Sequence, residues 1–245
     1  MARIDPLEGA GPTQDKFIRS HSLEKVLIGP RGEGKTEAGI RSMTYHAAMQ
    51  PEASRPIPYA IIRDTWKNLE RTTLRSFLNP HTASFAAHLR PYLKIKDGGG
   101  FLSLPGMWDA YLFGMDSIGD LDRLQSLQLG GLWIEEPSPA AAEDIGGGLE
   151  ERVVTVGITS LRHPCDYQLV QITSNYPDED HWLWQRYAVH RLPGRALFRI
   201  PRGENVSGAI SDDYRQNMET ALQGDEGLLQ RLVLGQPGLW CRARR

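Results

Sequence analysis

The sequence predicts an α/β fold with one mostly parallel central sheet flanked by helices. Three observations lead to this class. Short apolar runs of strand length alternate with helical segments along the chain. The 245 residues, 40% of them hydrophobic, are enough for one large α/β domain with a substantial core or for two small ones. A glycine-rich phosphate-binding pattern also follows the first apolar run and opens a helix.

The N-terminal segment, residues 1–24, has prolines and glycines and then a predicted helix from Thr13 to Ile18, with Thr13 as its N-cap. Gln14 lies in this helix, shortly before the phosphate-binding pattern. Its amide has the donor and the acceptor that an adenine edge needs, and several nucleotide motors use a glutamine there. A helical glutamine that faces solvent is an equally good interpretation.

Phosphate binding is indicated by GPRGEGKT at 29–36, which fits G-x-x-x-x-G-K-[ST]. The apolar run at 26–28 predicts a buried strand before it, and a helix of apolar spacing follows up to Pro51. Glycines let successive N–H groups face phosphate oxygens, Lys35 carries charge to the β- and γ-phosphates, and the Thr36 hydroxyl can bind Mg²⁺. A nucleoside triphosphate is therefore expected to contact Gly29, Pro30, Arg31, Gly32, Glu33, Gly34, Lys35 and Thr36.

The remaining elements follow from apolar runs separated by turn residues. Strands 101–104 and 107–113 are expected to pair about Pro105 and Gly106, and Ser211 is expected to cap the last helical region. Further strands are predicted at 58–63, 132–134, 169–173 and 196–200. Helices are predicted at 65–78, 181–190, 214–222 and 228–234, and 114–126 is expected to be partly helical.

Two adjacent carboxylates, Glu135 and Glu136, end the predicted strand 132–134. Ligands of open α/β sheets bind at the carboxyl ends of strands. In phosphoryl-transfer sites one such carboxylate holds Mg²⁺, usually through water, and a second can polarise the attacking water. Asn175 follows the next strand and would face the same crevice. The alternatives are a solvated strand end for the acid pair and turn chemistry for Asn175.

Composition and charge also bear on whether the protein binds nucleic acid, holds a structural metal or spans a membrane. The net charge is −2 and the pI about 6.4, so composition does not indicate nucleic-acid binding, although a local basic patch would suffice. Cys165 and Cys241 lie far apart and the seven histidines lack ligand spacing, so a structural metal is not expected. Without an apolar run of about 18 residues or an apolar signal core, we expect an intracellular protein with no membrane span.

Together these motifs resemble the ATPase domain of the large terminase subunit of tailed bacteriophages. The resemblance extends from Gln14 to the Gly-Leu-Trp at 238–240. It rests on GPRGEGKT at 29–36, GLWIEEPS at 131–138, Leu161-Arg162, ITSNYP at 172–177 followed by HWLWQRY, and Glu204-Asn205. It implies an additional-strand, RecA-like P-loop fold that hydrolyses Mg²⁺-ATP.

The resemblance also implies roles for individual residues. Gln14 would contact adenine, and Arg31 would be the phosphate-loop arginine of the family. Glu136 would be the catalytic base, and Asn175, with Ser174, would belong to the motif that couples hydrolysis to movement. Mg²⁺ would be held by Thr36 and Glu135.

The family's partners are double-stranded DNA, a portal protein and a small terminase subunit. By resemblance we expect a homo-oligomeric ring at the procapsid portal in the host cell cytoplasm, translocating DNA, and a monomer in isolation. A neighbouring subunit would supply an arginine to the site, for which Arg90, Arg123 and Arg162 are candidates.

The sequence departs from the family pattern at two positions. Glu135 stands where the family usually has aspartate and is one methylene longer. Tyr176 separates Asn175 from Pro177, where the family more often has Asn-Pro directly.

The expected organisation is an adenine-side segment at 1–24, an ATPase domain at 25–240 and a basic tail at 241–245. The family's nuclease domain would begin about where this sequence stops, so we interpret the sequence as the motor domain alone. Two alternatives stay open. One is another nucleic-acid-dependent ATPase such as a helicase, and the other is a nucleotide-gated assembly protein without steady turnover.

Overall fold

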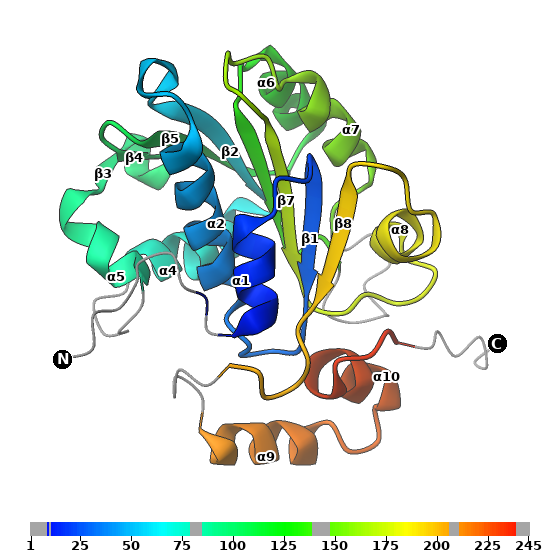
Figure 1. The fold of residues 1–245 in the computed structure, drawn as a ribbon. Helices are drawn as coiled ribbons and strands as arrows, with labels where there is room; N and C mark the ends of the chain where they lie inside the picture. Colours follow the sequence, from blue (N-terminus) through cyan, green and yellow to red (C-terminus); the bar gives the residue numbers. More distant parts are fainter. Residues whose placement is uncertain (1–8, 10, 79–84, 139–147, 206–210, 239–245) are drawn as a thin grey trace.

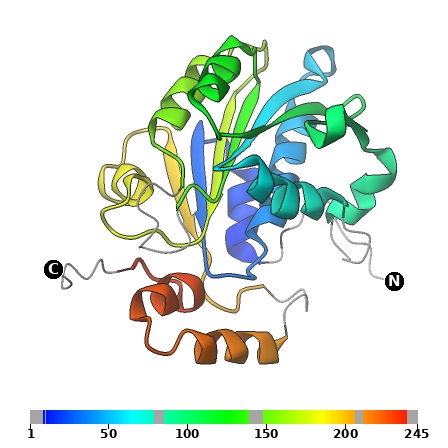
Figure 2. The same ribbon diagram turned by 180° about the vertical axis from the view of Figure 1, so that it is seen from behind.

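The computed structural model describes residues 9, 11–78, 85–138, 148–205 and 211–238. They form an eight-stranded sheet with helices on both faces (Figures 1 and 2). The strands are β1 (Glu24–Ile28), β2 (Ile57–Arg63), β3 (Lys94–Lys96), β4 (Phe101–Leu104), β5 (Trp108–Gly114), β6 (Gly131–Glu135), β7 (Leu169–Ser174) and β8 (Arg195–Arg199).

The helices between these strands are mostly short. The α-helices are α1 (Pro12–Arg19), α2 (Lys35–Met49), α3 (Trp66–Asn68), α4 (Arg75–Leu78), α5 (Phe85–Leu89), α6 (Ile118–Ser126), α7 (Arg152–Thr159), α8 (Trp182–Trp184), α9 (Asp212–Ala221) and α10 (Glu226–Leu229). The π-helical segments are η2 (Leu69–Leu74), η5 (Gln185–Val189) and η6 (Gln230–Leu234), and the 3₁₀ turns are η1 (Glu52–Ser54), η3 (Arg90–Tyr92) and η4 (Asp97–Gly99).

The strand order is β3-β4-β5-β2-β6-β7-β1-β8. β3, β4 and β5 pair antiparallel at one end, and the pairs from β5 to β8 are parallel. In this register Ile28 pairs with Ser174, and Glu135 pairs with Thr173. Parallel pairing therefore brings the ends of β1, β6 and β7 to one edge of the sheet, where the predicted site residues follow.

Strand alternation divides the core into two faces. Ile61 belongs to the same hydrophobic cluster as Met43 of α2, whereas its neighbour Ile62 belongs to the cluster that includes Val154 of α7. Gly39 lets α2 lie directly on the sheet, because a Cβ at this position would overlap the ring of Trp133. Figures 1 and 2 show α1 and α2 on one face and α6 and α7 on the other. With both faces covered, all residues of β1, β6 and β7 are buried, including the polar Glu24, Lys25 and Gln171.

The structure confirms every predicted strand and helix within one to three residues at most ends and adds elements that the sequence pattern did not predict. The additions are η1, α5, η3, β3, η4 and α7. The predicted N-cap is wrong: Gly11 is the N-cap of α1, and Pro12 opens the helix. Proline suits the first helical turn because its φ is preset and its missing N–H would have no partner there. Thr13 instead donates its hydroxyl to Glu204 at 2.7 Å.

The N-terminal helix packs into the same body as the loop that follows it. Phe17 and Ile18 of α1 share a cluster with Leu27 of β1 and Ala38 of α2. The predicted tail at 241–245, with Cys241, lies outside the described residues. In the part of the chain that the structure describes, no helix is both long and apolar enough to cross a membrane.

His46 should make the stability of the fold fall with decreasing pH. It is 1% exposed, and burial lowers its pKa from 6.5 to about 4. Its ring nitrogens meet the hydroxyl of Tyr59 at 2.5 Å and the carbonyl of Tyr167 at 2.8 Å. As the unfolded chain binds the proton first, the stabilisation is complete above the unfolded pKa of about 6.5 and is lost as pH falls toward 4. The loss at pH 5 should be about 2 kcal/mol.

Urea unfolding of wild type and His46→Gln at pH 7.5 and pH 5 measures this effect. The variant should be less stable at the higher pH and show a smaller loss on acidification. Substitution of the exposed His190 by Gln is the control and should leave the pH dependence of the wild type unchanged. An equal pH dependence in His46→Gln and wild type would contradict the assignment.

Candidate nucleotide-binding site

The phosphate-binding pattern forms the loop between β1 and α2. β1 ends at Ile28 and α2 begins at Lys35, so the loop lies at the carboxyl edge of the sheet. Gly32 and Gly34 have φ of 84° and 78°, a left-handed conformation that favours glycine. A Cβ at Gly34 would also come within 3.1 Å of Nε2 of Gln14. The two glycines thus allow the curled backbone that phosphate binding needs.

Lys35 directs its amine into this loop. The side chain is buried, and Nζ donates to the carbonyl of Pro30 at 2.7 Å and to Oδ1 of Asn175 at 3.0 Å. Burial lowers the pKa of the amine, while the carboxylates of Glu136 and Glu135 oppose this effect. The cation therefore lies between the loop and the strand ends that carry the predicted carboxylates and amide.

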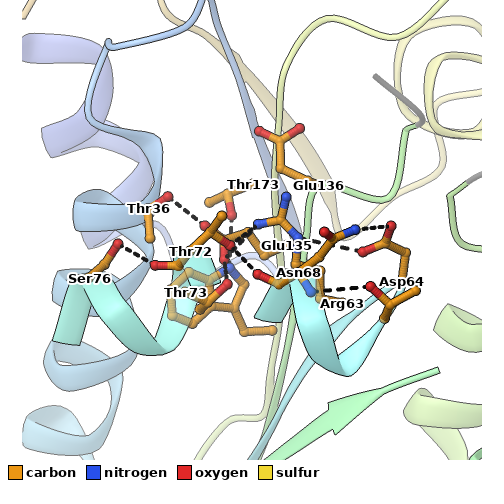
Figure 3. Close-up of polar contacts among 12 residues, drawn as sticks. Thr36, Arg63, Asp64, Asn68, Thr72, Thr73, Ser76, Glu135, Glu136 and Thr173 are labelled. Atoms are coloured by element: carbon orange, nitrogen blue, oxygen red, sulfur yellow. Dashed lines mark hydrogen bonds and ion pairs between the residues drawn. The ribbon is translucent and has the colours of Figure 1, made fainter. Parts of the chain in front are cut away.

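The two residues predicted to hold Mg²⁺ are in contact. Thr36, in the first turn of α2, donates its hydroxyl to Oε1 of Glu135 at 2.5 Å (Figure 3). Hydroxyl and carboxylate oxygens are the ligands that Mg²⁺ prefers, and a few suffice because the ion keeps several waters. With Lys35 beside them, these groups fit a magnesium–nucleotide complex. When bound, the metal would neutralise charge on the phosphates.

Glu135 is 2% exposed and has two further partners from an earlier part of the chain. Oε2 accepts from the hydroxyl of Thr73 and lies 3.8 Å from Nη1 of Arg63. Burial raises the pKa of Glu135, whereas Arg63 and the hydroxyls of Thr36 and Thr73 lower it. No local pattern marks Arg63 or Thr73 as site residues. They reach Glu135 only because β2 pairs with β6 in the sheet.

Glu136 follows β6 with a φ of 49°, a left-handed backbone that residues other than glycine rarely adopt. Such a conformation costs about 1–3 kcal/mol and occurs mainly at functional sites. The two adjacent glutamates point to different sides (Figure 3). Glu136 accepts from the backbone N–H of Asn175 at 3.2 and 3.1 Å and from Nδ2 of Asn175 at 3.0 Å. The two carboxylates can therefore serve different roles.

Asn175 connects the two charged groups of the site. Its Oδ1 accepts from Lys35, and its Nδ2 donates to Glu136. It follows the last residue of β7, Ser174, as the sequence indicates. Ser174 is fully buried, and its hydroxyl has no hydrogen-bond partner among the described residues. Of this predicted pair, Asn175 alone contacts other predicted site residues through its side chain.

Glu33 organises the other side of the loop. Its carboxylate is buried and accepts from the backbone N–H groups of Gly203 at 2.8 Å and Asn205 at 2.9 Å. Asn205 also donates Nδ2 to the carbonyl of Gly32 at 3.0 Å. Gln14 is fully buried and donates Nε2 to the carbonyl of Glu33 at 2.6 Å. The solvent-facing interpretation of Gln14 is therefore wrong, and contact with adenine stays a prediction.

The C-terminal helices contact the loop and the segments that follow β6 and β7. Leu232 of η6 accepts from the backbone N–H of Arg31 at 2.8 Å, while the Arg31 side chain is exposed. The buried Arg231 donates to the carbonyl of Tyr176 at 2.7 Å and to the hydroxyl of Ser138 at 2.9 Å. Figure 1 shows α9 and α10 below the sheet. Tyr176, the residue at which the sequence departs from the family pattern, therefore binds η6 through its backbone carbonyl.

The fold of this chain is similar to that of known structures. β7 is an additional strand between β1, which precedes the loop, and β6, which carries the carboxylates. Similar solved structures are large terminases of bacteriophages. The ADP complex of a large terminase from a thermophilic bacteriophage has a TM-score of 0.66 at 17% identity. The large terminase of bacteriophage HK97 has 0.62 at 15%, and the ATPase domain from Thermus phage P74-26 has 0.53 at 14%. The chain has the fold of a large terminase ATPase domain.

The terminase ATPase fold extends over nearly the whole chain. The match covers 92% of this chain with the ADP complex and with the HK97 protein, and 93% with the isolated ATPase domain. It covers 53% and 50% of the two large terminases and 93% of the isolated domain. The chain therefore spans about half the length of these two large terminases. No family model and no curated protein matches the sequence.

The three arginines that the sequence analysis considered as contacts to a neighbouring subunit differ in their surroundings. Arg162 donates Nη2 to the carbonyls of Gln125 at 3.2 Å and Leu127 at 2.8 Å, which fixes the end of α6. The side chain of Arg123 is 72% exposed and pairs with Asp120 at 3.2 Å on the same helix. Arg90, in η3, is also exposed. Arg123 also lies over the ring of Phe113, 5.4 Å from its centre. Arg123 and Arg90 are exposed to a partner, whereas Arg162, which binds two backbone carbonyls, is best explained as structural.

Proposed function

We propose that this chain is the ATP-hydrolysing motor domain of a viral DNA-packaging terminase. The observation that carries the proposal is the series of hydrogen bonds from Lys35 through Asn175 to Glu136, beside the Thr36–Glu135 pair. It combines a phosphate-binding cation, a metal-binding pair and a second carboxylate in one site. A hydrolase needs that second carboxylate, whereas a kinase needs room for an acceptor. The ADP complex of a protein with this fold gives further support.

Each of these residues has a role in the proposed reaction. Lys35 holds the β- and γ-phosphates, and Thr36 and Glu135 hold Mg²⁺. Glu136 accepts a hydrogen bond from the attacking water and orients it toward the γ-phosphate. Asn175 contacts both Lys35 and Glu136, so it is placed to change its partners when the γ-phosphate leaves. Buried against the loop, Gln14 binds the adenine edge.

The proposal includes the assembly in which such a motor works. We infer a homo-oligomeric ring on a portal protein, with a small terminase subunit, that moves double-stranded DNA into a procapsid in the host cell cytoplasm. The likeness in fold to large terminases supports this part of the proposal. A neighbouring subunit would complete the site with an arginine that stabilises the transition-state charge, and Arg123 is the strongest candidate.

Steady-state ATP hydrolysis across a range of protein concentrations tests the proposal. Turnover per subunit should be slow at high dilution and rise as subunits assemble, and linear double-stranded DNA should raise it further. Binding of a fluorescent ATP analogue should not depend on protein concentration. Tight ATP binding without turnover at any concentration would favour the nucleotide-gated assembly protein. Equal turnover at all concentrations would exclude a shared site and favour a helicase-like monomer.

Mixing two inactive variants provides the sharper test of the shared site. Arg123→Ala subunits retain Glu136, and Glu136→Gln subunits retain Arg123. If Arg123 acts on the neighbour, mixtures should recover turnover that neither variant shows alone. Arg90→Ala in the same mixture is the parallel test of the other exposed candidate. No recovery with either arginine variant would exclude both residues from this role.

A further inference from the structure

We propose that Thr73 is a positioning residue for the magnesium side of the site, and that it holds the carboxylate of Glu135 against Thr36. This inference rests on the proposed function. The two hydroxyls bind opposite oxygens of one carboxylate: Thr36 donates to Oε1 and Thr73 donates to Oε2. Figure 3 shows Thr36 from α2 and Thr73 from η2 on either side of Glu135.

The hydroxyls of Thr36 and Thr73 affect the site in different ways. A hydroxyl that donates to a carboxylate keeps its lone pairs, so the Thr36 oxygen stays available for a cation. With Thr73 on Oε2, the carboxylate cannot rotate about its last bond without losing a buried hydrogen bond. Thr73 is fully buried, and water cannot replace the lost partner. Thr73 therefore fixes the orientation that Thr36 and Glu135 share.

The helical run after β2 explains why Thr73 reaches the site. η2 is a π-helical segment between α3 and α4, and such segments often occur at functional sites. Two adjacent threonines in it bind different partners. Thr72 accepts from Nη1 of Arg63 at 2.6 Å, and Arg63 in turn lies 3.8 Å from Glu135. Asp64 lies 3.6 Å from Nε of Arg63 and accepts from Asn68 at 2.8 Å. The helical run after β2 thus brings the hydroxyl of Thr73 to Glu135. Its Thr72 also holds the guanidinium of Arg63 near the same carboxylate.

The length of Glu135 makes this contact necessary. Glutamate has one more rotatable bond than aspartate, and an unrestrained carboxylate at its end would occupy several orientations. Thr73 binds the oxygen that Thr36 does not, and Arg63 adds positive charge on the same side. An aspartate at this position would be one methylene shorter and would not reach both hydroxyls. Thr73 and the longer side chain thus act as a pair.

The test compares variants that remove or keep the hydroxyl. Thr73→Val removes it and keeps the shape, and Thr73→Ser keeps it. Ser76→Ala is the matched control, because the Ser76 hydroxyl bonds its own helix at the carbonyl of Thr72. Should the valine variant not fold, Thr73→Ala against Thr73→Ser isolates the same hydroxyl.

The first readout is the affinity for Mn²⁺, measured by electron paramagnetic resonance in the presence of ATP-γ-S. Thr73→Val should weaken it by about 10- to 100-fold, the usual effect of removing a group that orients a metal ligand. Thr73→Ser and Ser76→Ala should bind Mn²⁺ like the wild type. The second readout is nucleotide affinity in EDTA, which should be the same in all variants because Lys35 and the loop are intact. A merely structural role would change both readouts together.

A second arm tests whether Thr73 acts through Glu135. In a Glu135→Asp background, Thr73→Val should have little further effect on Mn²⁺ affinity, because the contact is already lost. Wild-type Mn²⁺ affinity in Thr73→Val, or full additivity with Glu135→Asp, would overturn the inference and leave the proposed function intact. If the wild type itself does not bind nucleotide, the proposed function fails and this inference fails with it.

Discussion

Replacing Glu136 by glutamine should reduce steady-state ATP hydrolysis by about 10²–10⁴-fold, the range expected for the loss of a general base. The amide keeps the size of the side chain, and its one oxygen can still accept from Asn175, but its NH2 group donates only and cannot replace the second acceptor. The amide also cannot accept the proton of the attacking water. The backbone of Glu136 is left-handed, and glutamine has the same branching as glutamate, so we expect no added backbone strain. Lys35, Thr36 and Glu135 are untouched, and ATP should bind as in the wild type.

The measurement is turnover at saturating Mg²⁺-ATP, with nucleotide binding followed separately by a fluorescent ATP analogue. Glu179→Gln, an exposed carboxylate in the turn after β7, is the control and should have wild-type turnover. Wild-type turnover in Glu136→Gln would show that another group activates the water. A parallel loss of ATP binding would instead assign Glu136 to the phosphate site.

Replacing Glu24 by glutamine should lower the free energy of unfolding by about 3 kcal/mol, because removal of one partner leaves buried charges uncompensated. Glu24 opens β1 and is buried. Oε2 accepts from the hydroxyl of Tyr187 at 2.7 Å and from Nη2 of Arg186 at 2.9 Å. Oε1 accepts from Nε of Arg195 at 3.1 Å. Burial raises the pKa of Glu24, but these hydrogen bonds outweigh it and the pKa is lowered overall.

The expected loss of about 3 kcal/mol in the free energy of unfolding lies at the lower end of the range for buried ion pairs. The reason is that the side chains of Arg186 and Arg195 remain 12% and 13% exposed to water. The melting temperature should fall by about 6–12 °C for a domain of this size. Differential scanning calorimetry measures it. Glu150→Gln is the matched control: its ion pair with Arg152 is exposed and should contribute less than about 1 kcal/mol. Equal melting temperatures for Glu24→Gln and wild type would show that the arginines find other partners.

The local part of the site could be predicted from the sequence. The loop glycines, Lys35 and Thr36 act through their spacing along one short segment, so their roles follow from the pattern itself. Glu135 and Asn175 could be predicted for a related reason. Parallel strands end at one edge of a sheet, so a polar residue after an apolar strand is expected to lie there.

Other contacts were invisible in the sequence because they join distant positions. The hydroxyl of Thr73 meets a carboxylate 62 residues later, and Tyr187 meets one 163 residues earlier. Periodicity within one element cannot reveal which strand will lie beside it. The start of α1 was missed for a different reason. Glycine followed by proline is typical of a turn, but proline also suits the first turn of a helix, and here Pro12 opens α1.

The sequence by itself determined the α/β class, the phosphate-binding loop and the carboxylates and amide that follow two strands. Backbone geometry and strand alternation act over a few residues, so short patterns suffice to predict them. Only the tertiary structure decided the order of the strands, with β7 between β1 and β6. That order determines which side chains share the site: Glu136 meets Asn175, and Glu135 meets Thr36 and Thr73. The strand order depends on packing between segments that are distant in the sequence, because burial of the whole core selects one arrangement of the strands.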